Sequence, residues 1–344
     1  MIRIGIIGLG AVGQIAHLAS FKAVAGCDVV AVADLRPGLC DLVCRHYGVT
    51  KAYGTHHALL NDPEVDAVAV VVRRPATGPI VLDALAASKH VLCEKPMAHT
   101  AEQGRRLVDA AAAACRHLAV GFMKRYDPGV WAFTKTLSRL RQGCTLGRML
   151  HVRTYSFAGN DGLVRGGFLM TDEERPDGLD LWPVAPSWVP ASQAGDYASF
   201  LNVHSHMINL VNHLFGSLPT IVLAQRHRYA NGLTAIVQWD DMDGVMEFGE
   251  SKSNDWHEGI EVVFERGRLT LNLPMPLRPM AIGEVTLVTE TETRRLAADG
   301  ADWAFRAQAQ GFVRAVKGGD APLTTGAGSI EDLVFMEQLW SKGT

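Results

Sequence analysis

Largely apolar runs alternate with segments of helical pattern along the first third of the chain. The apolar runs cover residues 2–7, 29–33, 65–72, 90–93 and 118–122, and the helical segments cover 14–25, 37–47, 79–87 and 101–115. A strand that is apolar throughout is typical of a parallel sheet whose two faces are both covered by helices. The pattern predicts a doubly wound α/β domain.

The pattern changes after about residue 145, where short strand patterns follow one another with turn residues between them. Strands are expected at 149–157, 221–228, 233–239, 245–248, 260–264, 269–273 and 285–289, and helices near 203–215, 303–317 and 329–340. Because no long helix separates these strands, an open, mainly antiparallel sheet is expected. We therefore expect two domains, 1–123 and 124–344, with a final helix able to pack back on the first.

Composition narrows the class of protein. The chain has 344 residues, of which 48% are apolar and 20% charged, and its net charge is −3. These values are ordinary for a globular protein of two domains. The negative net charge argues against a surface of basic residues that would bind nucleic acid. No apolar run reaches 18 residues, so no membrane span is expected, and the first residues lack the pattern of a signal peptide.

Cysteine spacing bears on metals and on the cellular compartment. The six cysteines all lie in the first half of the chain, at Cys27, Cys40, Cys44, Cys93, Cys115 and Cys144. None forms a Cys-x-x-Cys pair, so neither a zinc site nor a disulfide framework is expected. We expect no metal, and free thiols in a reducing cytoplasm.

A glycine fingerprint follows the first strand. Gly8, Gly10 and Gly13 have the spacing G-x-G-x-x-G, and Asp34 ends the next strand 21 positions after Gly13. This context is typical of a Rossmann dinucleotide-binding fold. The first glycine makes a tight turn, the second lets the backbone approach a pyrophosphate, and the third permits close helix–strand packing.

The fingerprint also favours one cofactor. Asp34 can accept from the ribose hydroxyls and would repel a 2′-phosphate, so NAD is favoured over NADP. Arg36, two residues on, opposes this preference because it could attract that phosphate. The predicted cofactor contacts in this region are Gly8, Gly10, Ala11, Val12, Gly13, Asp34, Leu35 and Arg36.

A second motif carries a family resemblance. Residues 87–96 read ASKHVLCEKP, which resembles the Ala-Gly-Lys-His-Val-Leu-x-Glu-Lys-Pro stretch of the glucose–fructose oxidoreductase and inositol dehydrogenase (Gfo/Idh/MocA) family. The resemblance extends in order along the whole chain. It implies that Pro96 follows an often cis junction and that Lys95 points into an active site, where an ammonium can stabilise a developing alkoxide. Glu94 and Lys95 are also expected at the cofactor.

The resemblance continues on the helix that ends in Leu-Phe-Gly at residues 214–216. The family pattern there is Asp-x-Gly-x-His-x-x-Asp, and this chain has Asn202, His204, His206 and Asn209 at its four named positions. His206 is thus implied as the general base, for which imidazole is suited. Asn202 cannot titrate, and it can orient a hydroxyl or His206. For His204, at the family's glycine position, three roles stay open: it replaces the proton path that is lost with Asn202, it contacts substrate, or it only fills space.

Two turns supply further candidates. The family's Thr-Pro-Asn-like turn after the fourth strand is replaced here by Val72, Arg73 and Arg74, which changes the cofactor-side wall and could add an anion contact. Residues 121–128 resemble the family's Gly-Phe-x-Arg-Arg-aromatic-Asp-Pro stretch, with a solvated basic turn as the alternative. Their candidate contacts to substrate or nicotinamide ribose are Lys124, Arg125 and Tyr126.

The long irregular segment 159–200 contains Trp182 and Trp188. Aromatic faces stack on the C–H faces of sugars, and a lid would exclude water from a reaction. Plain packing or an oligomer contact is the alternative for both tryptophans.

These observations predict an NAD-dependent dehydrogenase acting on a secondary hydroxyl of a sugar, cyclitol or glycoside. Two alternatives stay open. Some proteins that resemble this chain, such as sugar-pathway corepressors, bind the dinucleotide without redox chemistry. Others use NAD transiently within an elimination or hydrolysis cycle.

The second domain is expected to mediate self-association. Apolar residues at adjacent strand positions, such as Ile236 with Val237 and Val262 with Val263, place side chains on both faces of a sheet. One face then lacks cover within the chain. A homodimer or homotetramer built through this face is expected, as the resemblance also implies.

Overall fold

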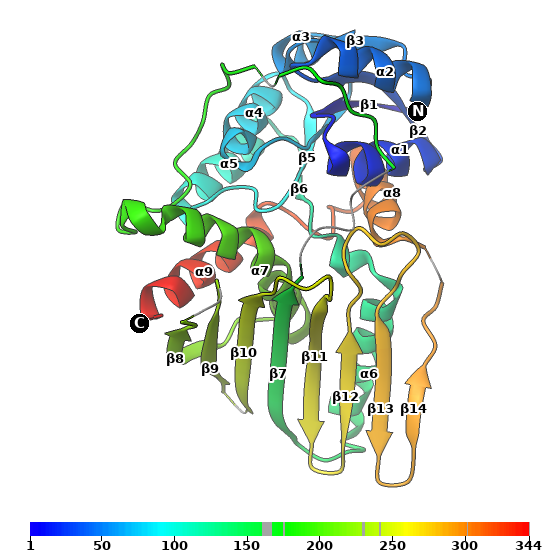
Figure 1. Ribbon diagram of the computed structural model, residues 1–344. Helices are drawn as coiled ribbons and strands as arrows, with labels where there is room; N and C mark the ends of the chain where they lie inside the picture. The colour runs from blue at the N-terminus through cyan, green and yellow to red at the C-terminus, as the bar shows by residue number, and fades with distance from the viewer. Residues whose placement is uncertain (160–166, 175, 229–230, 241, 301, 344) are drawn as a thin grey trace. The chain divides into compact units, whose positions relative to one another are not determined.

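Six parallel strands form the sheet of the amino-terminal part of the computed structural model, in the order β3-β2-β1-β4-β5-β6. The structure describes residues 1–159, 167–174, 176–228, 231–240, 242–300 and 302–343. The strands are β1 (Ile2–Ile7), β2 (Cys27–Ala33), β3 (Lys51–Tyr53), β4 (Ala67–Val70), β5 (His90–Cys93) and β6 (Leu118–Val120). This is the predicted doubly wound sheet, and Figure 1 shows it in blue and cyan.

Helices connect these strands on both faces of the sheet. They are the π-helical segment η1 (Gly13–Leu18), α1 (Ala19–Ala23), α2 (Pro37–Tyr47), α3 (His56–Leu60), α4 (Arg74–Ala86) and α5 (Ala101–Ala113). α4 begins five residues before the predicted start at 79, because Pro75 occupies its first turn, where a proline is tolerated. The sequence prediction had taken the interior Pro79 as the beginning of the helix.

The chain divides into two units. The first comprises Met1–Phe122, Val164–Ala194 and Phe305–Leu333, and the second comprises Met123–Leu163, Gly195–Ala304 and Val334–Thr344. The chain therefore returns to the first unit twice, which the expected single boundary between 123 and 124 does not describe. Among the described residues, no helix has both the length and the apolar character to cross a membrane.

The second unit holds an eight-stranded sheet in the order β14-β13-β12-β11-β7-β10-β9-β8. Its strands are β7 (Met149–Ala158), β8 (Thr220–Arg226), β9 (Leu233–Trp239), β10 (Met242–Glu250), β11 (His257–Phe264), β12 (Gly267–Asn272), β13 (Glu284–Thr289) and β14 (Thr293–Leu296). All neighbours are antiparallel except β7 and β10. That parallel pair requires a crossover, which α7 and the strands β8 and β9 supply.

The remaining helices are η2 (Met123–Tyr126), α6 (Pro128–Gly143), η3 (Ala191–Gln193), α7 (Ala194–Phe215), α8 (Ala304–Val316), η4 (Ala327–Ser329) and α9 (Ile330–Lys342). Within the second unit, α7 packs on the sheet through Phe200, whose ring centroid lies 5.8 Å from that of Phe248. Trp340 of α9 contacts the same Phe200 at 5.5 Å. One face of the sheet is thus covered by helices.

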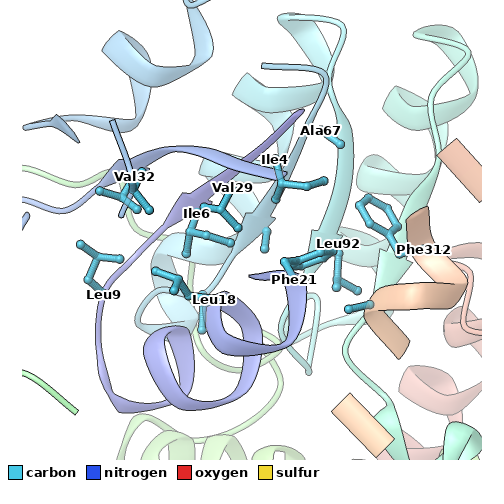
Figure 2. Close-up of a cluster of buried hydrophobic side chains, with 14 of the residues drawn as sticks. Ile4, Ile6, Leu9, Leu18, Phe21, Val29, Val32, Ala67, Leu92 and Phe312 are labelled. Carbon is cyan, nitrogen blue, oxygen red and sulfur yellow. The ribbon is translucent and has the colours of Figure 1, made fainter. Parts of the chain in front are cut away.

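The core of the first unit is closed by a helix from late in the chain. Figure 2 shows Phe312 of α8 beside side chains from β1, β2 and the helix after the glycine turn. The ring centroids of Phe312 and Phe21 lie 6.2 Å apart in an edge-to-face arrangement, and both residues are buried. α8 is therefore part of the amino-terminal core although almost 200 residues separate it from β6.

Replacing Phe312 by Ala should lower the free energy of unfolding by about 3–5 kcal/mol, because a buried aromatic side chain leaves a cavity when it is truncated. Urea denaturation followed by circular dichroism measures the loss. Gln310→Ala is the matched control, since Gln310 is exposed on the same helix and its replacement should change stability by less than about 0.5 kcal/mol. Equal losses in the two variants would contradict the placement of α8 in this core.

Candidate dinucleotide and catalytic residues

The glycine turn has the geometry that its spacing predicted. Gly8 has φ +97°, and a Cβ on it would lie 2.1 Å from the carbonyl oxygen of Val71. A Cβ on Gly13 would lie 2.2 Å from the carbonyl oxygen of Gly8, whereas one on Gly10 would meet no atom within 4 Å. The first and third glycines therefore permit close backbone packing. The open space at Gly10 fits the approach of a pyrophosphate.

Asp34 lies at the end of β2, beside this turn. Its carboxylate accepts from the Leu9 amide at 2.9 Å and forms a two-point ion pair with Arg36, at 2.8 Å and 3.0 Å. Burial by itself raises the pKa of the Asp34 carboxyl, but the bonds from Arg36 and Leu9 outweigh it and hold the pKa below its usual value. The side chain is thus an anion, suited to accept from a ribose.

The other predicted cofactor contacts lie on the same edge of the sheet or near it. Val72 follows β4, and its side chain comes within 3.1 Å of where a Gly8 Cβ would be. Arg73 precedes α4 and is exposed. Ala11, Val12 and Leu35 are half-buried around the fingerprint. Because neighbouring parallel strands end at one edge, β1, β2 and β4 bring these residues together.

Glu94 and Lys95 follow β5, the next strand along that edge. The Lys95–Pro96 peptide is cis, as the resemblance implied. A Glu94 oxygen lies 2.6 Å from Nε2 of the buried His17, and the other accepts from the Lys95 amide at 3.1 Å. Burial raises the pKa of Glu94, yet His17 and the charge of Lys95 bring it below its usual value. Glu94 therefore ties the glycine-turn helix to the Lys95 loop.

In the second unit, α7 carries the predicted catalytic residues. Asn202 is half-buried, His206 is 5% exposed and Asn209 is 2% exposed. Spacings of four and three place them on one helix face. Arg125 donates to the Asn209 carbonyl at 3.0 Å, so it fixes this part of α7 to η2.

Lys124 and its neighbours are buried rather than solvated. Lys124 is 4% exposed and is paired with Glu258 of β11, whose carboxylate also accepts from the Trp256 indole at 2.7 Å. Tyr126 is likewise buried. These placements exclude the alternative of a solvated basic turn. Glu258 and His17 were not among the predicted site residues, because nothing in their local sequence marks them as partners of distant residues.

Two predicted substrate contacts have packing roles in the structure. His204 is fully buried between the rings of Phe200 and Phe248, with Nδ1 3.4 Å from the Ser156 hydroxyl. Of the three roles left open for it, the structure favours filling space, because this face of α7 packs on the sheet.

Trp182 is likewise held in a packed arrangement. Its ring packs against Gly78 of α4 and lies under the Arg106 guanidinium, and its amide donates to the Pro75 carbonyl at 2.8 Å. These contacts favour the packing alternative over a sugar platform. Trp188 is 48% exposed.

One cluster of potential metal ligands lies outside these sites. The ligand atoms of His56, His57 and Asp83, on α3 and α4, lie within 4.8 Å of one another. No metal was expected from the sequence, and these three residues were not among the predicted site residues. His56 lies 3.1 Å from the Asp83 carboxylate, so the two side chains form a hydrogen-bonded pair.

Glu258→Gln should lower the free energy of unfolding by about 3–5 kcal/mol, because it leaves the buried Lys124 ammonium without its counter-charge. Chemical denaturation measures the loss. Replacing both partners, Lys124→Met with Glu258→Leu, should restore most of it. Asp299→Asn removes a carboxylate from an exposed pair with Lys135 and should change little. A loss in the double variant as large as in Glu258→Gln would contradict the buried-pair explanation.

Comparisons with known proteins agree with this geometry. Residues 2–122 match the model of an oxidoreductase family with an NAD-binding Rossmann fold. Inositol 2-dehydrogenase of Paracoccus denitrificans is 40% identical over 141 residues, which are 40% of this chain and 42% of that protein. The enzyme of the same name from Pseudomonas fluorescens is 41% identical over 154 residues, 44% of this chain and 45% of its own. The matches thus span less than half of these relatives.

Solved structures show the same fold along the whole chain. A 3-ketoreductase from Actinomadura kijaniata, solved with NADP and TDP-benzene, has a TM-score of 0.78 at 19% identity and covers 99% of this chain and 98% of its own. Aldose–aldose oxidoreductase from Caulobacter crescentus, complexed with glycerol, has a TM-score of 0.77 at 18% identity and covers 99% and 97%. Residues 2–122 thus match the NAD-binding Rossmann domain of an oxidoreductase family, and the solved structures share the fold of the whole chain.

Proposed function

We propose that the whole chain is an NAD-dependent dehydrogenase that moves a hydride between nicotinamide and a secondary hydroxyl or ketone of a sugar, cyclitol or glycoside. One observation carries the proposal. A glycine turn with open space at Gly10 lies on the same sheet edge as the Asp34 carboxylate and as Lys95, which follows β5. The names of the relatives that match 40% and 44% of the chain support this substrate class.

In this proposal, different residues of the chain bind the cofactor and act on the substrate. NAD, when bound, supplies the hydride acceptor. The amides of the glycine turn bind the pyrophosphate, and Asp34 accepts from the ribose. The Lys95 ammonium stabilises developing alkoxide charge, and the His206 imidazole takes the hydroxyl proton. Asn202, which cannot titrate, holds a hydroxyl or His206 in orientation.

Asn202 also keeps a second candidate function, a sensor that binds NAD without redox chemistry. NADH fluorescence in the presence of a panel of polyols and glycosides separates the possibilities. Net NADH formation supports the dehydrogenase, and binding without turnover supports the sensor. Product without net NADH supports a transient redox step within an elimination or hydrolysis cycle.

His206→Ala should lower turnover by roughly 10²–10⁴-fold, the usual contribution of a positioned general base, with little change in NAD affinity. Steady-state kinetics and NAD titration measure the two effects. His213→Ala is the control, because His213 lies two turns further along α7 and should retain turnover. Near wild-type turnover of His206→Ala would assign proton transfer to another group.

We also propose that the chain forms a homodimer or homotetramer through the second face of its sheet. Leu223 and Ile236 are paired across β8 and β9, and they are 55% and 49% exposed. Next to them the same face carries the Arg153–Glu247 ion pair. An apolar patch bordered by charge is typical of an association surface.

Light scattering at micromolar concentration should give a mass of at least twice the 37.3 kDa of one chain. Ile236→Lys should shift the mass toward one chain, because it places a charge in the apolar part of the face. Gln142→Lys adds the same charge at an exposed position of α6, which is not part of this sheet face, and should leave the mass unchanged. A single-chain mass for the wild type would contradict association through this face.

We also propose a cytoplasmic location, because the cysteines of the chain are free thiols. All six cysteines are free, and free thiols persist in reducing compartments.

A further inference from the structure

A segment from the middle of the chain lies against the cofactor edge of the first unit. We call residues 168–174 and 176–183 the strap. At one end, the Gln14 amide donates to the Leu169 carbonyl and accepts from the Leu169 amide, each at 2.9 Å. At the other end, Gln103 donates to the Pro183 carbonyl at 3.0 Å. Figure 1 shows this green segment beside the blue amino-terminal elements. Both ends of the strap are therefore held by the Rossmann unit.

Between these ends, Glu173 of the strap caps helix α2. Its two carboxylate oxygens accept from the amides of Gly38 and Leu39, at 2.9 Å and 3.0 Å. Thr171 donates to the same carboxylate at 2.8 Å. A Cβ on Gly38 would lie 2.9 Å from a Glu173 oxygen, so the glycine is what permits this approach. A residue 134 positions away thus satisfies the helix end that Arg36 and Pro37 leave uncapped.

This helix end lies next to the position of the adenosine ribose. In dinucleotide folds the acidic residue after the second strand accepts from the ribose, and a nearby arginine accommodates the 2′-phosphate of NADP. The first amides of the following helix also attract anions. Two groups here could therefore bind a 2′-phosphate: the Arg36 guanidinium and the amino end of α2.

Both partners are already occupied by carboxylates of the chain. The Asp34 carboxylate accepts hydrogen bonds from two nitrogens of Arg36, and the Glu173 carboxylate accepts from the first two amides of α2. Asp34 foremost, with Glu173 contributing, raises the pKa of the Arg36 guanidinium, which places all three charges in one neighbourhood. A 2′-phosphate would have to displace Glu173 and approach two negative charges.

We propose that Glu173 is a specificity-determining residue, which excludes the 2′-phosphate of NADP by occupying the amino end of α2 while Asp34 occupies Arg36. This inference rests on the proposed dinucleotide binding and deepens it. It assigns part of the cofactor choice to the strap, which lies outside the glycine fingerprint. NAD has no 2′-phosphate, so it can bind without displacing Glu173.

The test compares Glu173→Gln with Glu174→Gln in the full-length chain. Glutamine keeps only one of the two acceptor oxygens, so the change removes the charge and frees one of the two α2 amides that Glu173 occupies. Glu174 is exposed and no hydrogen bond or ion pair is recorded for it among the described residues, so its replacement makes the same change in net charge. NAD⁺ and NADP⁺ are titrated separately into each protein by calorimetry.

Glu173→Gln should tighten NADP⁺ binding by about tenfold or more, the usual effect of one charged contact, and change NAD⁺ affinity less than about twofold. Glu174→Gln should change neither. An unchanged NADP⁺/NAD⁺ ratio in Glu173→Gln overturns the inference, as does an equal shift in Glu174→Gln. If the wild type binds NAD⁺ and the NADP⁺/NAD⁺ ratio of Glu173→Gln is unchanged, only this inference is contradicted. If the wild type binds neither dinucleotide, the proposed function is contradicted.

Discussion

The close approach of backbone at Gly8 is the constraint on which the first unit depends. The Val71 carbonyl lies where a side chain on Gly8 would have to be, and the Gly8 carbonyl lies where one on Gly13 would be. Only residues without a Cβ permit the end of β1 to turn this tightly against the loop after β4. This turn places the Leu9 amide where it donates to Asp34. The Asp34 carboxylate is therefore positioned by the same turn that leaves space at Gly10.

The second unit depends on a different kind of interaction, the buried pair of Lys124 and Glu258. It joins η2, which directly follows the end of the first unit, to β11 in the middle of the sheet. Two buried charges are retained only where each satisfies the other. Arg125 adds a contact from the same turn to α7. Two consecutive residues, Lys124 and Arg125, thus fix a strand and a helix that come much later in the chain.

Sequence patterns predicted whatever depends on local periodicity or on backbone freedom. The fingerprint, the parallel strands and most of the second sheet have their expected positions, because apolar runs and glycine spacing report directly on strands and tight turns. Two strands were missed, since β3 has three residues and β14, with the sequence TRRL, has no apolar alternation. The direction of single side chains was harder to predict. His204 and Trp182 have chemistry suited to a site, but distant packing partners determine where they lie.

The difference between local and distant contacts also applies to the groups near the dinucleotide edge that can bind anions. Three positive features surround the dinucleotide edge: the amino end of the glycine-turn helix, Arg36 and the amino end of α2. Arg36 is matched by Asp34, two residues away, and α2 is matched by Glu173 from the strap. At Gly10 a Cβ would meet no atom within 4 Å, so the first feature is open to a ligand. A pyrophosphate at this turn would therefore meet open space, whereas any further phosphate would have to compete with the carboxylates that pair with Arg36 and cap α2.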